Sequence, residues 1–141
     1  MLKKMFNLQK KLNSLAIDKE RHDGFFEDLC TNDAPAWEDL RIKWLLDFNR
    51  AQMHESMEFE DCLPWKWWKH GLVDRQNLKV ELVDELHFFI SKCLVAGIDA
   101  EELFRVYKQK LDLNIKRQND GYRTGEYQKI IDGEEDNRSI K

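Results

Sequence analysis

Residues 36–60 read AWEDLRIKWLLDFNRAQMHESMEFE, and this stretch decides the fold. Its apolar side chains recur at steps of three and four residues, which is the period of a helix with one buried face. They are Trp37, Leu40, Trp44, Leu45, Phe48, Ala51 and Met57. Pro35 suits the first turn of such a helix, where its missing N–H has no partner to lose. The stretch therefore predicts one long amphipathic helix from about Ala36 to about Glu60.

One further helix is expected before this one and another after it. Residues 2–17 place apolar side chains at roughly helical spacing, with lysines opposite. Downstream, Asp74 is a suitable N-cap for a helix from about Arg75 to about Ala96. Gly97 is a typical residue at the end of a helix. Both segments therefore add helices that can pack against the long one.

A fourth helix is predicted after these. Asp99 can cap it, with Glu102 three residues later as in a capping box, and its apolar pattern ends before Gly121. Two segments lack such periodicity. Residues 18–34 are expected to form a connector with a short turn, and residues 121–141 are rich in polar side chains and glycine.

The composition agrees with a helical protein. The chain has 141 residues, of which 42% are hydrophobic and 35% charged, so it is long enough for one domain with a real core. Only two prolines and six glycines interrupt it, which favours long helices over many short strands. We therefore expect an all-α fold, a compact bundle of four main helices that forms a single domain over residues 1–141.

Charge and cysteine content limit the classes of function. The net charge of −4 argues against a protein that binds nucleic-acid polymers through bulk positive charge. Cys30, Cys62 and Cys93 are widely spaced and form no Cys-x-x-Cys motif, so we expect reduced thiols and a cytoplasmic protein. We expect neither a signal peptide nor a membrane-spanning segment.

Two acidic pairs, Glu55-x-x-Glu58 and Glu81-x-x-Asp84, lie on consecutive predicted helices. The spacing puts both carboxylates of a pair on one helix face, and the loop between the helices makes them antiparallel. Four converging carboxylates need cations, and an all-oxygen set suits Mg²⁺ or Mn²⁺. The alternative is a solvated helix face, because chance pairs are common among 27 acidic residues. The two pairs together favour metal-assisted chemistry on a phosphate.

A di-iron site is a different reading of the same helices. Ferritin-like bundles use Glu-x-x-His on two helices. Asp84-x-x-His87 has this spacing once, but Ala51, not a carboxylate, stands three residues before His54. The second half of a di-iron motif is therefore missing. A lone histidine such as His87 is also more often a hydrogen-bonded core residue than a ligand.

The segment between the acidic pairs reads Trp65-Lys66-Trp67-Trp68-Lys69. Tryptophans packed this densely often seal one end of a bundle. Lysines within the cluster also suit a second reading, in which an aromatic ring stacks on a base and an ammonium meets a phosphate. A basic segment from Asn114 to Lys129 has the same two readings, a solvated helix end or a phosphate clamp. No Walker-type loop occurs.

The motifs together resemble the all-α, dimeric dUTPase family, within the superfamily of MazG-type nucleoside triphosphate pyrophosphatases. They are Glu55-x-x-Glu58, Pro64-Trp-Lys-Trp-Trp-Lys69, Glu81-Leu-Val-Asp84, His87-Phe88, Arg117-Gln118-x-x-Gly121-Tyr122-x-x-Gly125-x-Tyr127-x-Lys129 and Gly133-x-Glu-Asp-Asn137. Gln9-x-x-Leu12-Asn13 is similar to the base-reading element of the family. The stretch from Glu81 through Tyr122 is also similar to the dCTP/dUTP pyrophosphatases of T-even phages, so the chain resembles a phage-type member.

The resemblance implies Mg²⁺-dependent hydrolysis of dUTP to dUMP and pyrophosphate. It assigns metal binding to Glu55, Glu58, Glu81 and Asp84, and activation of the attacking water to Glu58 or Glu55. It assigns phosphate contacts to Lys66, Lys69, Arg117, Tyr122 and Lys129, and a place near the metals or the sugar to Asn114. It assigns base recognition and stacking to Gln9, Asn13, Trp67 and Phe88. Residues 121–141 would close over the substrate.

Several points stay open at this stage. The preferred base can be uracil, cytosine or either, and Mn²⁺ can replace Mg²⁺. The resemblance implies a homodimer in which both copies contribute to the site, in the bacterial host cytoplasm if the gene belongs to a phage. The alternative from a different class is a non-catalytic helical module that binds a protein partner through the tryptophan loop.

Overall fold

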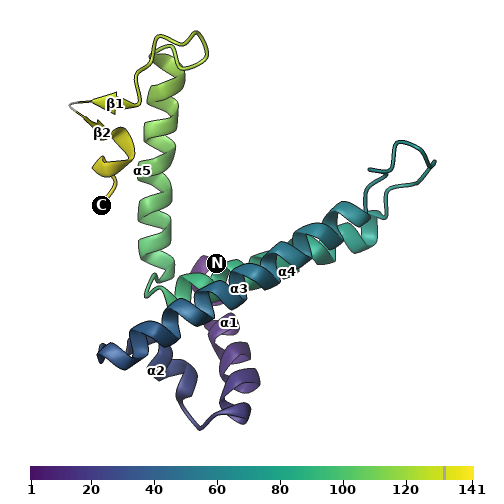
Figure 1. Ribbon diagram of the computed structural model, residues 1–141, viewed down its shortest axis with the longest axis vertical. Helices are drawn as coiled ribbons and strands as arrows, with labels where there is room; N and C mark the ends of the chain where they lie inside the picture. Colours follow the sequence, from purple (N-terminus) through teal and green to yellow (C-terminus); the bar gives the residue numbers. More distant parts are fainter. Residues whose placement is uncertain (132) are drawn as a thin grey trace. The chain divides into compact units, whose positions relative to one another are not determined.

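The computed structural model describes residues 1–131 and 133–141. Five α-helices make up most of the chain (Figure 1), which confirms the all-α class. They are α1 (Leu2–Ile17), α2 (Phe25–Thr31), α3 (Pro35–Asp61), α4 (Arg75–Val95) and α5 (Ala100–Asn119). The shorter elements are the 3₁₀-helices η1 (Asp18–Glu20) and η2 (Asp136–Ser139) and the strands β1 (Ile130–Ile131) and β2 (Glu134–Glu135). The chain divides into two units, Met1–Asp99 and Ala100–Lys141.

The predicted end signals of the long helices are confirmed. Pro35 is the first residue of α3, and one carboxylate oxygen of Asp74 accepts hydrogen bonds from the N–H groups of Gln76 (3.2 Å) and Asn77 (3.0 Å) at the start of α4. Gly97 follows α4 with a φ of +72°, a conformation that side chains with a Cβ rarely adopt.

The short helix α2 was expected only as a turn in a connector. Asp18 stabilises its start, because its side chain accepts a hydrogen bond of 2.9 Å from the N–H of Phe26. Phe26 and Leu29 are 0% exposed, and they pack with Phe25, Phe48 and Val95 in the core of the first unit. The fourth helix of this unit is therefore α2, whereas α5 belongs to the second unit.

Helices α3 and α4 form a long antiparallel hairpin whose two arms lie side by side (Figure 1). Two contacts define how the arms are aligned. The rings of Phe48 and Phe88 pack with centroids 6.3 Å apart, and the ammonium of Lys92 donates a hydrogen bond of 2.9 Å to the side chain of Asn49. This alignment brings the second half of α3 beside the first half of α4.

The second unit consists of α5 and the segment that follows it. β1 and β2 pair antiparallel, with Ile130 opposite Glu135, and η2 follows directly. Gly121, with a φ of +88°, ends α5, and a Cβ there would lie 2.7 Å from the side chain of Glu126. The backbone of this turn therefore requires glycine. Among the described residues, no helix is long and apolar enough to cross a membrane.

Candidate metal and nucleotide site

Three of the four predicted carboxylates come together on the α3–α4 hairpin. Glu55 on α3 and Glu81 and Asp84 on α4 each offer one oxygen, and these oxygens lie within 4.8 Å of one another. Glu81 is buried, with 5% of its surface exposed, and the other two are half-buried. The alignment of the two arms produces this cluster, because it places residues far apart in sequence on facing sides of the hairpin.

The carboxylates of the cluster repel one another. Burial raises the pKa of Glu55 above its ordinary value, and the charges of Glu58, Asp84 and Glu81 raise it further. The side-chain nitrogen of Asn77 donates a hydrogen bond of 2.7 Å to one oxygen of Glu81, which orients that carboxylate. Three oxygen ligands that repel each other fit a hard divalent ion such as Mg²⁺ or Mn²⁺.

Glu58 is placed differently from the other three carboxylates. It is exposed and does not belong to the group of oxygens within 4.8 Å, although its charge contributes to the raised pKa of Glu55. Its carboxylate is therefore beside the cluster and open to water. Such a position suits a group that takes a proton from a water molecule.

The di-iron reading gains no support from the arrangement of the side chains. In the part of the chain that the structure describes, the one group of three potential metal ligands contains only carboxylates. His87 is not a member of this group and instead lines a groove between α1 and α4. The donor set therefore lacks the histidine that a ferritin-like site requires.

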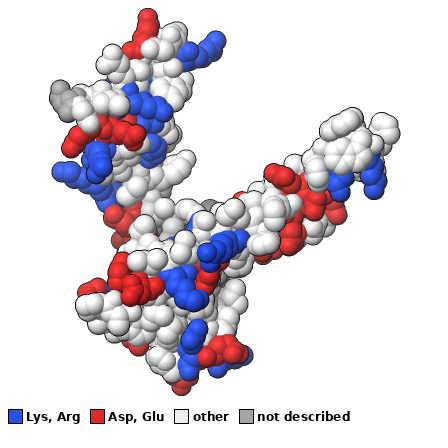
Figure 2. Space-filling model, in the orientation of Figure 1, with Lys and Arg blue, Asp and Glu red and all other residues white. Residues whose placement is uncertain are grey.

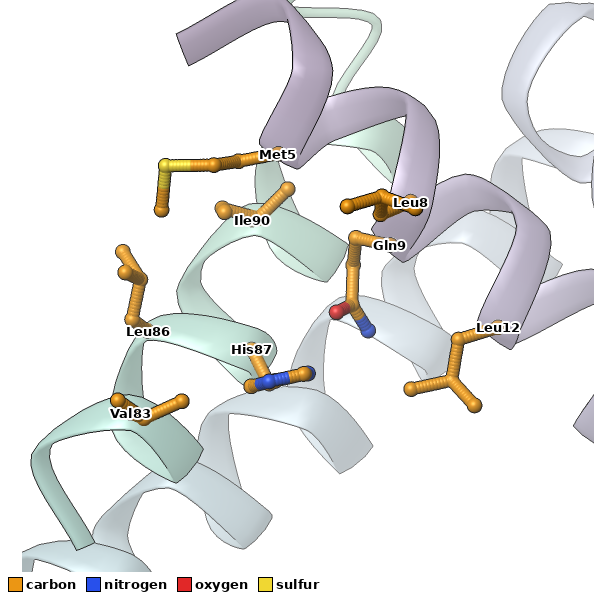
Figure 3. Close-up of a pocket in the computed structure, with 8 residues that line it drawn as sticks. All are labelled: Met5, Leu8, Gln9, Leu12, Val83, Leu86, His87 and Ile90. Carbon is orange, nitrogen blue, oxygen red and sulfur yellow. The ribbon is translucent and has the colours of Figure 1, made fainter. Parts of the chain in front are cut away.

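The predicted base-reading residues lie on α1, which packs against α4. Gln9 and Asn13 are both buried, and their amide groups hydrogen-bond to each other and to Ser91. Gln9 and His87 also line a groove of about 360 Å³ (Figure 3). The rest of its wall is apolar and consists of Met5, Leu8, Leu12, Val83, Leu86 and Ile90. A planar apolar ring with a polar edge fits such a groove.

The predicted stacking residue, Phe88, lies between the acidic cluster and this polar network along α4. Glu81, Asp84, Phe88 and Ser91 succeed one another at steps of three and four residues, so they share one face of the helix. Ser91 is about 10 Å from Asp84 along the helix axis. The carboxylate cluster, the ring of Phe88 and the network of buried amides therefore follow one another along α4.

The tryptophan–lysine loop lies at the tip of the hairpin and is not a plug. Trp67 is 90% exposed, and Trp65 and Trp68 are exposed as well, each ring meeting its neighbour edge-on. The ammonium of Lys66 lies 4.9 Å from the centre of the Trp65 ring. Figure 2 shows basic side chains at this tip and acidic ones along the adjoining part of the hairpin. Lys66 and Lys69 are therefore available to an anion in this single chain.

The predicted phosphate-binding residues of the C-terminal part lie in the second unit. Arg117 makes a two-point ion pair with Asp136, at 2.9 and 2.5 Å, and donates a hydrogen bond of 3.2 Å to Asn114. Lys129 lies with its ammonium 5.1 Å from the centre of the Tyr122 ring. Arg117 is thus paired with a carboxylate of its own unit.

Sequence reasoning missed several polar residues around the site. Asn77 and Ser91 were not singled out, because their roles depend on partners from other turns and helices. Asp136 appeared only as part of a motif. The side-chain oxygen of Gln52, one turn before Glu55, is buried and accepts no hydrogen bond among the described residues. The signal in the sequence that points to Gln52 is its spacing, because it stands three residues before Glu55 and so shares a helix face with the acidic pair.

Fold and site together define an all-α protein that carries a cluster of three carboxylates on a helical hairpin. The chain belongs to the dUTPase family, whose model matches residues 1–95. It is 30% identical to the dCTP pyrophosphatase of Enterobacteria phage LZ5, over 86% of this chain and 82% of the relative. It is 33% identical to the dCTP pyrophosphatase of Enterobacteria phage T4, over 46% of each chain. No solved structure gives a significant match.

Proposed function

We propose that this protein hydrolyses a pyrimidine deoxynucleoside triphosphate, dUTP in the first place, to the monophosphate and pyrophosphate with the help of Mg²⁺. The observation that supports this most is the group formed by Glu55, Glu81 and Asp84, within 4.8 Å, in a member of the dUTPase family. Similar phage proteins are named dCTP pyrophosphatases, so dCTP or both nucleotides are the alternative substrates.

The proposed division of work follows the positions of the carboxylates. Glu55, Glu81 and Asp84 would hold the cation, with Glu58 at its edge, and Asn77 would keep Glu81 in place. A bound divalent cation neutralises charge on the phosphate chain and makes a nearby water more acidic. Glu58 would orient a water molecule and take its proton while the water adds across the phosphoanhydride bond between the α- and β-phosphates. The products are the nucleoside monophosphate and pyrophosphate.

The rest of the nucleotide would lie along α4. The base would sit beside Gln9 and Asn13 and stack on Phe88, and the phosphates would extend past the acidic cluster toward Lys66, Trp67 and Lys69. Asn114, Arg117, Tyr122 and Lys129 are the residues of the second unit proposed to contact the phosphates and the sugar, with residues 121–141 closing over the substrate. The order of polar groups along the hairpin supports this direction of binding.

We also propose that the active form is a homodimer. Large apolar side chains of the first unit are exposed in the single chain, among them Met53 and Met57 on α3. A second copy of the chain would cover such side chains at an interface. A molecular-mass measurement in solution tests this part of the proposal, and a monomer at micromolar concentration would count against it.

A substrate panel tests the proposed activity. The purified protein is incubated with dUTP, dCTP, dTTP and UTP in the presence of Mg²⁺, and pyrophosphate release is measured. Release from dUTP or dCTP is expected, and a preference for dCTP would change the substrate but not the class of enzyme. If no pyrimidine nucleotide is cleaved and neither Mg²⁺ nor nucleotide shifts the melting temperature, a partner-binding module becomes the better description. Stoichiometric iron in the purified protein would favour the di-iron alternative.

A further inference from the structure

A closed hydrogen-bond network links α1 to α4 beside the groove. The side-chain nitrogen of Gln9 donates to the oxygen of Asn13 (2.9 Å) and to the hydroxyl oxygen of Ser91 (3.0 Å). The side-chain nitrogen of Asn13 donates to the same hydroxyl oxygen (2.9 Å). Ser91 is 1% exposed, and both amides are buried, so water does not compete for these bonds.

The direction of the Ser91 hydroxyl decides how the network is arranged. Its hydrogen is donated to the backbone carbonyl of His87, one turn earlier in α4, at 2.8 Å. A longer contact of 3.4 Å to the oxygen of Asn13 is the weaker alternative for the same hydrogen. With its one hydrogen donated, the hydroxyl can only accept from Gln9 and Asn13.

These constraints leave one orientation for the Gln9 amide. Both hydrogens of its nitrogen are used, one by Asn13 and one by Ser91. The reverse orientation would place the Gln9 oxygen against two other acceptors, which is unfavourable in a buried site. The oxygen of Gln9 is therefore left for the groove, and Figure 3 shows it turned toward the side on which Ile90 and Leu86 lie.

We propose that Ser91 is a positioning residue that fixes the Gln9 amide so that its oxygen accepts a hydrogen bond from the base of the substrate. This inference rests on the proposed function. Uracil offers such a hydrogen at N3 and cytosine at its exocyclic amine, whereas the carbonyl oxygens of both bases and N3 of cytosine are acceptors. If the Gln9 oxygen is fixed in an apolar wall, every orientation of the base that places one of its own acceptor atoms against this oxygen is unfavourable.

Loss of the Ser91 hydroxyl frees the amide to turn. In Ser91→Ala the Gln9 nitrogen loses one acceptor, so both orientations become accessible and the groove no longer selects one base edge. We expect KM for the preferred nucleotide to rise about tenfold and the ratio of kcat/KM between dUTP and dCTP to shrink by a similar factor. The kcat at saturating substrate is expected to stay within about threefold, because Ser91 is about two helical turns from Asp84.

Three further variants separate this role from a structural one. Ser91→Thr keeps the hydroxyl and is expected to keep the discrimination between bases. Ser91→Cys keeps the approximate shape with a much weaker acceptor, and it replaces Ser91→Ala if that variant does not fold. Ser56→Ala is the matched control, because the Ser56 hydroxyl makes the same kind of bond to its own helix, to the carbonyl of Gln52 at 3.1 Å. It should leave the ratio unchanged.

The possible results distinguish a failure of the role of Ser91 from a failure of the proposed function. Binding of dUMP and dCMP, measured by calorimetry, accompanies the kinetics so that recognition is observed without turnover. If Ser91→Ala or Ser91→Cys discriminates between the bases as well as the unaltered protein does, or if the unaltered protein does not discriminate between them, the role of Ser91 is refuted while the proposed function stands. If the unaltered protein neither cleaves nor binds any pyrimidine nucleotide, the proposed function fails, and the role of Ser91 fails with it.

Discussion

The carboxylates of Glu55 and Asp84 come from different helices and lie within 4.8 Å of each other, with the carboxylate of Glu81 completing the group. The packing of Phe48 against Phe88 fixes the two helices in this alignment. The negative charges repel each other in the metal-free protein, and a divalent cation removes that repulsion. Metal binding is therefore expected to be coupled to the stability of the hairpin.

Replacing Glu55 by Gln is expected to show separately the repulsion among the clustered carboxylates and their binding of a metal ion. The metal-free variant should melt about 3 °C higher than the unaltered protein, because one of the clustered charges is gone. The rise in melting temperature that millimolar Mg²⁺ or Mn²⁺ gives the unaltered protein should disappear. Glu60→Gln, an exposed carboxylate on the same helix, is the control and should keep that rise. A full metal response in Glu55→Gln would remove Glu55 from the cation site.

The difference in stability between the metal-free unaltered protein and metal-free Glu55→Gln should depend on pH. The pKa of Glu55 is raised above its ordinary value of 4.5 in the folded state, chiefly by burial. Its ionisation therefore destabilises the folded state, and the unfavourable contribution develops as pH rises through the folded pKa. The metal-free protein and Glu55→Gln should melt alike near pH 4, and the gap should widen toward pH 7. A gap that is constant from about pH 4 to pH 7 would contradict the assignment of the repulsion to Glu55.

Much of the fold could be predicted because its end signals are local. Pro35, Asp74 and Gly97 mark helix ends through their own backbone or side-chain chemistry. The short helix α2 was missed as a helix because it has too few turns to show a period, although its Phe26 and Leu29 are the centre of the core.

The candidate site was predictable only in part, for a related reason. Spacing places Glu55 and Glu58 on one face of a helix, but the rotation of that helix against α4 decides which of them joins the cluster. Ser91 gains its role from Gln9, 82 residues earlier in the chain, and a single sequence does not show such a pairing.

Glu58→Gln tests the proposed proton acceptor. The neutral amide cannot take a proton from water, so kcat should fall by about 10²–10⁴-fold. The melting-temperature shift with Mg²⁺ should remain, because Glu58 is outside the carboxylate cluster. Stopped or initial-rate measurement of pyrophosphate release gives the first quantity and thermal unfolding the second. An active variant would exclude Glu58 as the base, and a lost metal shift would make it a metal ligand instead.

Asp136→Asn is expected to loosen the end of the second unit. Asp136 holds Arg117 by two hydrogen bonds and accepts another, of 2.8 Å, from the hydroxyl of Tyr127, and these contacts hold its pKa well below the ordinary value. The neutral amide cannot form the ion pair. Trypsin should therefore cut after Arg123 and Lys129 several times faster than in the unaltered protein. Glu134→Gln, at an exposed carboxylate nearby, should be cut at the original rate. Equal rates for all three proteins would show that the ion pair does not hold this segment.

Leu29→Ala tests whether α2 is a structural part of the first unit. Leu29 is 0% exposed, and its truncation leaves a cavity where α2 meets the core, so the free energy of unfolding should fall by about 3 kcal/mol. Leu72→Ala, at a side chain that is 96% exposed, should change it by less than about 0.5 kcal/mol. Urea unfolding measures both. Because α2 contacts both α1 and α4, the cavity should also weaken the packing that keeps Gln9 beside Ser91. A Leu29→Ala protein as stable as Leu72→Ala would mean that α2 is a surface element and that α1 is held on α4 by the Gln9–Ser91 contact and its neighbours alone.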